Sequence, residues 1–117
     1  MDITLGSWNI WIKNNGDFKG IAKVIRDHRI DIIGIQEAGI LFNGRESENS
    51  VEHIAKELGY FFVFYPACDA RPRQPWIVGN AIISRFPIIQ SGSHRLNAFP
   101  LKYPWGQAQP NTQPKIA

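Results

Sequence analysis

The sequence has one cysteine, no acidic residue after Asp69 and no long apolar run. A single thiol, Cys68, excludes an internal disulfide bond, which fits a reducing compartment such as the cytoplasm. We expect Cys68 to be a small residue that is buried or half-buried. No apolar stretch approaches the roughly 20 residues that cross a bilayer, and the basic and apolar segments of a signal peptide are missing. These absences predict a cytoplasmic protein without a membrane span.

Several common catalytic and ligand-binding motifs are missing as well. The chain has no cluster of histidines and cysteines at metal-ligand spacing, no glycine-rich phosphate loop and no serine nucleophile elbow. It does have an ordinary globular composition, with 117 residues of which 44% are hydrophobic and 20% charged. A chain of this size forms at most one domain with its own core.

The charge is distributed unevenly along the chain. Residues 1–69 carry 7 basic and 10 acidic side chains, whereas residues 70–117 carry 6 basic side chains and no acidic one. A basic second part favours a polyanionic partner such as nucleic acid or a phosphorylated ligand. The alternative interpretation is that the compensating acidic residues lie in a portion of the fold that this chain lacks.

The first part of the chain predicts a strand, a helix and a second strand. Residues 3–10 are rich in strand formers, and residues 14–17 indicate a loop. Apolar side chains at helical spacing then predict an amphipathic helix over residues 18–29. Residues 31–35 are almost continuously apolar, which is typical of a central strand covered on both faces. Together these segments predict a βαβ unit.

A second helix follows a loop predicted over residues 39–48. Residues 49–52 hold an N-cap residue followed three positions later by glutamate, and Gly59 occupies the usual position after a helix end. An aromatic strand over residues 60–65 is expected to stop at Pro66.

The last part of the chain has weaker signals. Residues 69–75 indicate a loop, and residues 79–84 indicate another strand. Residues 91–117 contain scattered prolines and few apolar periods, so we expect a weakly structured tail without defined strands or helices.

Polar side chains follow the first two predicted strands. Glu37 comes directly after an apolar strand, at the end where open α/β sheets place their ligands. A carboxylate there suits Mg²⁺. Asn9, at the corresponding end of the first strand, is placed to coordinate weakly or to hold a phosphate or a second carboxylate by hydrogen bonds. The alternative is a solvated glutamate in a loop and an asparagine that caps a turn.

Three segments together resemble the endonuclease/exonuclease/phosphatase family. They are residues 7–10 (Ser-Trp-Asn-Ile), residues 31–37 (Asp-Ile-Ile-Gly-Ile-Gln-Glu) and residues 79–88 (Gly-Asn-Ala-Ile-Ile-Ser-Arg-Phe-Pro-Ile). The resemblance implies the N-terminal half of a deoxyribonuclease-I-like four-layer α/β sandwich with mixed sheets. It also implies hydrolysis of phosphate esters that depends on Mg²⁺, with Mn²⁺ as an alternative ion.

The resemblance also implies roles for three residues. Asn9 matches the first active-site asparagine of the family, and Glu37 matches its metal-binding glutamate. Arg85 belongs to the third segment, and it either meets a substrate phosphate or has a structural role. The substrate remains open, because members of the family act on DNA, RNA, lipid head groups and small phosphate esters, and a fold does not choose among them.

Later motifs of the family do not occur in residues 1–117, which we therefore interpret as a single partial domain. The Asn-Thr-His, Asp-x-Asn and Ser-Asp-His segments are missing, and in the family they supply the histidine and aspartates of the reaction. His28 and His53 fall on the predicted helices, and His94 lacks a strand and carboxylate context. We therefore expect the chain to be inactive alone.

Two alternatives to a partial phosphoesterase stay open. One is a non-catalytic module that binds a polyanion or a protein through the basic second part, and the other is an inert truncation product. Half of a sandwich also leaves apolar sheet surface unpaired, so we expect self-association through that surface.

Overall fold

The computed structural model describes residues 2–11, 17–94, 102–103 and 106–107. Its elements are, in chain order, β1 (Leu5–Asn9), α1 (Phe18–Asp27), β2 (Ile32–Asn43), β3 (Glu46–Asn49), α2 (Ser50–Leu58), β4 (Phe61–Asp69), β5 (Trp76–Ser84), β6 (Lys102–Tyr103) and β7 (Gly106–Gln107).

Five of these strands form one mixed sheet with the order β1-β2-β5-β4, and β3 pairs with the second half of β2. β1 and β2 are parallel, as expected for a βαβ unit with α1 as its connection. β5 lies between β2 and β4 and is antiparallel to both. The mixed sheet with its helices confirms the predicted α/β fold class.

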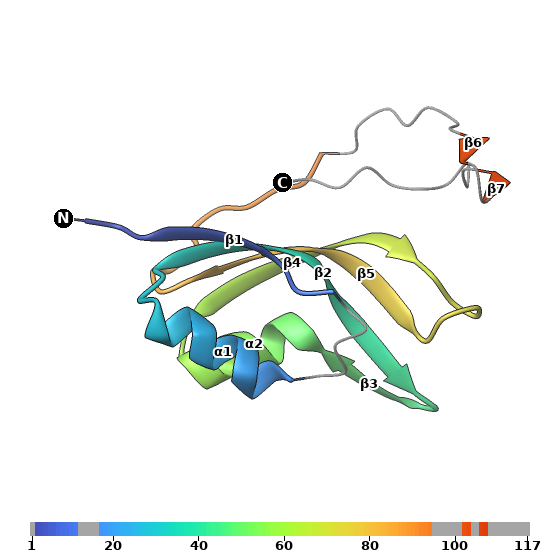
Figure 1. The fold of residues 1–117 in the computed structure, drawn as a ribbon, viewed down its shortest axis with the longest axis horizontal. Coiled ribbons are helices and arrows are strands. Elements are labelled where there is room, and N and C mark those ends of the chain that lie inside the picture. The colour runs from blue at the N-terminus through green and yellow to red at the C-terminus, as the bar shows by residue number, and fades with distance from the viewer. Residues whose placement is uncertain (1, 12–16, 95–101, 104–105, 108–117) are drawn as a thin grey trace.

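Both helices cover the same face of the sheet (Figure 1). Buried side chains from α1, α2, β2 and β5 form one core, in which Ile25, Ile54, Ile35 and Ile83 are among the fully buried members. Burial of an isoleucine side chain of this kind stabilises the fold by roughly 1.5–3 kcal/mol. This core therefore fixes the helices to one side of β2 and β5.

Local signals fix the ends of both helices. The side chain of Asp17 accepts a hydrogen bond from the backbone of Gly20 at the start of α1. Asn49 accepts from the backbone N–H groups of Val51 and Glu52, and Gly59 ends α2 with a φ of +69°. The predicted cap of the second helix is thus confirmed.

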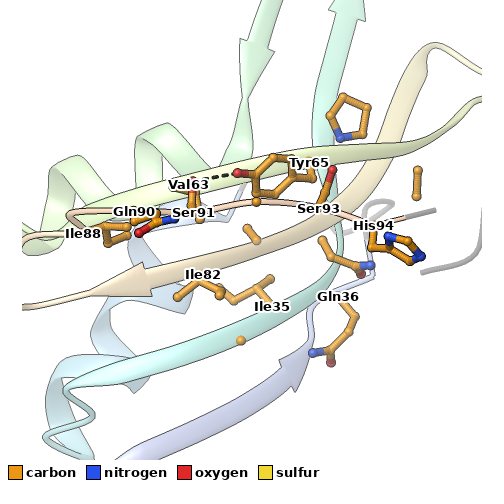
Figure 2. A pocket seen from close by; sticks show the side chains of 16 residues that line it. Ile35, Gln36, Val63, Tyr65, Ile82, Ile88, Gln90, Ser91, Ser93 and His94 are labelled. Carbon is orange, nitrogen blue, oxygen red and sulfur yellow. Dashed lines mark hydrogen bonds between the residues drawn. The ribbon is translucent and has the colours of Figure 1, made fainter. Parts of the chain in front are cut away.

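The opposite face of the sheet carries no helix, and we call it the helix-free face. It is formed by alternate residues of each strand, and pairing places Leu5, Ile32, Ser84 and Phe61 in one row across it. Residues 88–94 cross over part of this face above β4 and β5 (Figures 1 and 2).

The prediction of a loop over residues 39–48 is wrong. β2 continues to Asn43, turns through Gly44 and Arg45, and returns as β3. Gly44 has a φ of +64°, which glycine adopts without strain, and this allows a two-residue hairpin. Ile40 and Leu41 pair with β5 on their other side, a contact between distant segments that stabilises the extended strand.

Two further expectations are corrected. β4 does not stop at Pro66 but continues to Asp69, because a register shift lies between Pro66 and Cys68 and because β4 is the last strand of the sheet. The strand expected over residues 79–84 begins earlier, at Trp76. Cys68 is a half-buried thiol, as expected.

The predicted tail, residues 91–117, lies mostly outside the described residues. Within it the structure does contain two short strands, β6 and β7, which pair with each other, although no strand was expected there. No helix in the part of the chain that the structure describes is long and apolar enough to span a membrane.

Candidate active site

Asn9 ends β1 and holds the chain as it leaves the sheet. Its side chain is exposed, and its Oδ1 accepts a hydrogen bond from the backbone N–H of Trp11 at 3.0 Å. The backbone N–H of Ile10 donates to the carbonyl of Gln36 at 3.1 Å, which continues the pairing of β1 and β2. Asn9 therefore does cap a turn, and this hydrogen bond also fixes the orientation of its carboxamide.

Glu37 lies at a β-bulge within β2 rather than at the end of that strand. Ile33, Ile35 and Ala38 are all buried, although regular alternation would place Ala38 on the other face from Ile35. The register with β5 shifts between Ile35 and Ala38, so the strand contains one extra residue there. Glu37 is half-buried and has a φ of +54°, a left-handed conformation that is strained for a residue other than glycine.

Strand pairing brings polar residues from four strands into one line across the sheet. Asn9 on β1 pairs with Gln36 on β2, and Gln36 and Glu37 together oppose Asn80 on β5. Asn80 in turn pairs with Tyr65 on β4. We call these five residues the polar row. The structure therefore brings the two predicted residues Asn9 and Glu37 to neighbouring positions and adds three residues to them.

A second bulge lies on the other side of β5, next to the polar row. The register of β4 with β5 shifts between Pro66 and Cys68, opposite Gly79 and Val78. At Gly79 the two strands approach so closely that an added Cβ would lie 2.1 Å from the carbonyl oxygen of Tyr65. Since bulges are frequent beside active sites, two of them flanking one position support a functional role for this part of the sheet.

A cavity of about 330 Å³ lies on the helix-free face beside the polar row, beneath residues 88–94. Figure 2 shows Gln36 and Tyr65 of the row at its wall, together with Ser91 and His94 of the crossing segment. The hydroxyl groups of Tyr65 and Ser91 lie 2.6 Å apart in a hydrogen bond that ties this segment to β4.

Asn80 also lines this cavity and is only 9% exposed. Its Oδ1 is buried and has no hydrogen-bond partner among the residues that the structure describes. A buried acceptor of this kind costs about 1–3 kcal/mol of stability. Asn80 lies in the segment 79–88 that carries part of the family resemblance, but no site role was expected for it from the sequence.

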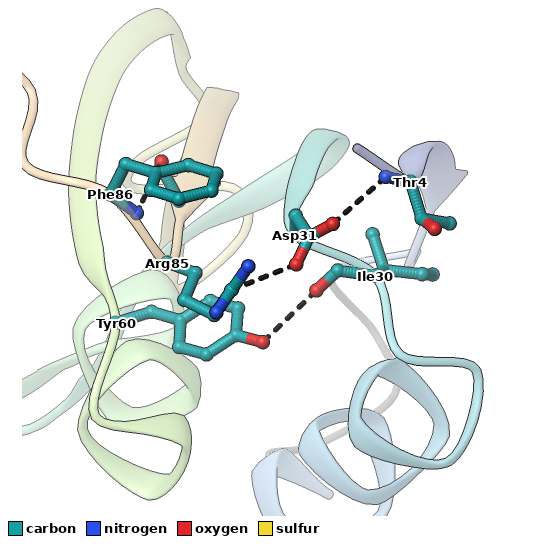
Figure 3. A network of polar contacts seen from close by, with 7 residues as sticks. Thr4, Ile30, Asp31, Tyr60, Arg85 and Phe86 are labelled. Atoms are coloured by element: carbon teal, nitrogen blue, oxygen red, sulfur yellow. Dashed lines mark hydrogen bonds and ion pairs between the residues drawn. The ribbon is translucent and has the colours of Figure 1, made fainter. Parts of the chain in front are cut away.

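Arg85, the third predicted site residue, lies at the other end of the sheet, next to the pair formed by Ser84 and Ile32. Its Nε donates to Oδ1 of Asp31 at 2.8 Å (Figure 3). Its backbone N–H donates to the Asp31 carbonyl, also at 2.8 Å. The structure does not bring Arg85 together with Asn9 and Glu37. This placement supports its structural role.

Asp31 joins three segments of the chain at that end. Its Oδ2 accepts a hydrogen bond from the backbone N–H of Thr4 at 2.9 Å. The pKa of Asp31 is lowered from its ordinary value, first by this hydrogen bond and then by the charge of Arg85. Asp31 is thus held as a carboxylate that fastens the ends of β1, β2 and β5.

The basic second part of the chain is partly neutralised by acidic residues of the first. Besides the pair of Arg85 with Asp31, Arg71 donates two hydrogen bonds to the carboxylate of Asp69, at 2.9 and 2.8 Å. These hydrogen bonds lower the pKa of Asp69 to about 2. The guanidinium of Arg71 also lies 4.4 Å from the ring centre of Phe42. Both arginines therefore have structural contacts, which weakens the hypothesis of a polyanion-binding module.

The histidines of the two helices have structural surroundings. A ring nitrogen of His28 lies 2.8 Å from the Val24 carbonyl, and the ring of His53 stacks on Phe18 at 4.9 Å. His94, by contrast, lines the cavity. Within the described ranges no three histidine, cysteine, aspartate or glutamate side chains gather into a metal-binding group.

The polar row nevertheless contains donors of the type that Mg²⁺ prefers. The Glu37 carboxylate offers hard oxygen ligands, whereas Oδ1 of Asn9 already accepts the Trp11 N–H. Mg²⁺ commonly uses one or two carboxylates while it keeps several waters. The residues present therefore fit an ion that is held partly by protein and partly by water and substrate oxygens.

Comparison with known proteins gives a consistent result. A sequence model described as the Endonuclease/Exonuclease/phosphatase family matches residues 6–116. The fold is similar to the solved structure of an endonuclease/exonuclease/phosphatase family protein from Leptotrichia buccalis, with a TM-score of 0.60 and 19% sequence identity. The similarity covers 76% of this chain and 40% of that one, so the matched part of the chain corresponds to less than half of the solved protein. A search of curated proteins found no match.

Proposed function

Since the chain belongs to the Endonuclease/Exonuclease/phosphatase family, we propose that it carries the metal-binding part of the active site of a Mg²⁺-dependent phosphoesterase. The substrate is a phosphodiester or phosphomonoester, with nucleic acid among the candidates. The observation that carries the proposal is the polar row, in which strand pairing puts Asn9 beside the bulge that holds Glu37.

Glu37 would hold the ion, with Mn²⁺ as an alternative to Mg²⁺, and the bound ion would polarise the phosphoryl oxygen and neutralise the leaving oxygen. Asn9 uses its Oδ1 to accept the Trp11 N–H, which leaves its amide nitrogen to donate a hydrogen bond to a phosphate oxygen. Both side chains belong to paired strands, so they are positioned before the substrate arrives.

The polar row contains one carboxylate and no histidine. Phosphoryl transfer depends mainly on the positioning of the reacting groups and on the neutralisation of their charge. A metal ion together with the Glu37 carboxylate and the Asn9 carboxamide would supply only part of the positioning and part of the neutralisation. We therefore propose that residues 1–117 bind the metal ion and by themselves hydrolyse phosphate esters slowly or not at all.

Metal binding tests the proposal independently of activity. Mn²⁺ binding, followed by electron paramagnetic resonance, would be compared for the wild-type chain, Glu37→Gln and Glu46→Gln. Glu46 is an exposed carboxylate on β3 of the same sheet and serves as the matched control. Glu37→Gln is expected to weaken binding by at least about tenfold, since even the loss of a residue that only supports a metal ligand has an effect of that size. The Glu46→Gln chain should bind like the wild type.

Hydrolysis of bis(p-nitrophenyl) phosphate and nicking of plasmid DNA would be measured on the same three proteins. Any activity should need Mg²⁺ and should disappear in Glu37→Gln. Equal Mn²⁺ binding by all three proteins, with circular dichroism showing that each is folded, would refute the assignment of Glu37.

A further inference from the structure

Asn80 occupies an unusual position for a polar residue. It lies in the middle of the central strand β5, between a bulge on β2 and a bulge on β4. Ala81 and Ile83 of the same strand belong to the apolar core on the helix side, whereas Asn80 faces the helix-free side. Its Oδ1 is buried without a partner among the described residues. An apolar side chain of similar size would avoid the desolvation cost at this position. The carboxamide is therefore best explained by a group that binds it.

The cavity next to Asn80 has a definite chemical character. The described residues that line it include apolar side chains, such as Val63, Ile82 and Ile88, and uncharged polar ones, such as Gln36. None of these lining residues is a lysine, arginine, aspartate or glutamate. A phosphate would find no lysine or arginine there, and His94 is the one histidine among the described lining residues. An uncharged group with apolar faces and hydrogen-bonding edges would find both kinds of contact, and the volume of about 330 Å³ is within the range of small-molecule sites.

We propose that this cavity binds the nucleobase of a nucleotide substrate, and that Asn80 selects bases with an exocyclic amine. This proposal rests on the proposed phosphoesterase function and names its substrate class. Gln36 lines the cavity and also belongs to the polar row. The substrate would therefore place its phosphate beside Asn9 and Glu37 and its base beside Asn80.

The side chains favour a base over a sugar or another polyol. Val63 and Ile82 pair with each other on β4 and β5 and offer adjoining apolar surface to the face of a planar ring. Asparagine and glutamine carboxamides present a donor and an acceptor side by side, which is the pattern that pairs with the amino edge of adenine. The buried Asn80 oxygen is the acceptor, and an exocyclic amine is the matching donor.

Nucleoside binding without phosphate and without metal tests this assignment. Adenosine and purine riboside differ by the exocyclic amine alone. Their affinities for the wild-type chain would be measured by isothermal titration calorimetry, and the affinity of myo-inositol would be measured in the same way to test binding of a polyol. Adenosine is expected to bind about tenfold more tightly than purine riboside, within the range for a base contact of this kind, and myo-inositol is not expected to bind.

Asn80→Leu should remove the difference between adenosine and purine riboside, and its melting temperature should equal or exceed that of the wild type. Glu37→Gln should keep the difference while it loses metal binding, which separates this proposal from the proposed function. Equal affinities of the wild type for the two nucleosides, a preference for myo-inositol, or a lower melting temperature of Asn80→Leu would each overturn the proposal.

Discussion

At the scale of single residues, Glu37 and Asn80 both lower the stability of the folded chain. Glu37 has a φ of +54°, a conformation that costs an L-amino acid roughly 1–2 kcal/mol of conformational free energy. Asn80 buries an oxygen that has no partner in the described part of the chain. Unfavourable features of this kind concentrate at functional sites. Their presence at adjoining positions supports the polar row as the site.

The backbone strain at Glu37 predicts a difference between two substitutions that both remove the carboxylate. Glu37→Gly is expected to be more stable than Glu37→Ala by about 1 kcal/mol, because glycine adopts a positive φ without steric cost. Urea unfolding of the two proteins would measure this difference. An alanine variant as stable as the glycine variant would show that Glu37 is not strained.

At the scale of elements, both helices and β1 could be predicted closely, whereas β2, β4 and β5 were predicted too short and β3 was missed. The ends of α2 follow from Asn49 and Gly59, whose effects on the backbone are local. The full length of β2 depends on pairing with β5, which lies more than 30 residues later in the sequence. Gly44 occupies the first of the two loop positions between β2 and β3, where a hairpin turn of this length favours glycine, so this residue is a local signal for the turn.

The polar row was only half predictable for the same reason. Asn9 and Glu37 follow apolar segments, so the sequence pattern and the family resemblance both indicated them. Asn80 and Tyr65 join them through strand register, and two bulges alter that register. Bulges of this kind leave no pattern that a reading of the sequence alone detects.

β5 depends on a small residue where it passes the bulge of β4. Gly79→Ala would place a Cβ 2.1 Å from the Tyr65 carbonyl oxygen, so the strands would have to move apart. We expect this substitution to destabilise the fold by about 1–3 kcal/mol, the usual cost of overpacking.

Gly34→Ala is the matched control on β2, where the atom nearest to an added Cβ is 3.7 Å away, on the Gln36 side chain. This change should be neutral or stabilising by up to about 1 kcal/mol. Thermal unfolding of both variants would check the pair, and a Gly79→Ala protein as stable as Gly34→Ala would contradict the close approach of β4 and β5.

At the scale of the whole molecule, the two faces of the sheet differ. One face is covered by α1 and α2, and the helix-free face exposes apolar side chains, among them Leu5, which is 70% exposed, and Phe61. Exposed apolar surface of this extent on a sheet commonly marks an interface. The expected self-association should therefore involve this face.

Substitution of a single exposed apolar residue tests that expectation. Leu5→Lys is expected to shift the chain toward monomer in sedimentation velocity experiments, because a charge would be placed within the contact. Val24 on α1 is also exposed and apolar, at 41%, but lies on the helical side. Val24→Lys should leave the distribution unchanged, and an equal effect of both variants would exclude the helix-free face as the contact.

The central place of β5 also determines when the sheet can assemble during synthesis. Among the described strands β2 and β4 each pair with β5 and not with each other. Both helices and the first four strands leave the ribosome before residues 76–84, so the nascent chain holds β4 without its partner. Such partly assembled chains expose strand edges and aggregate readily. Translation through β5 is therefore the step that joins β4 to β2 and completes the five-stranded sheet.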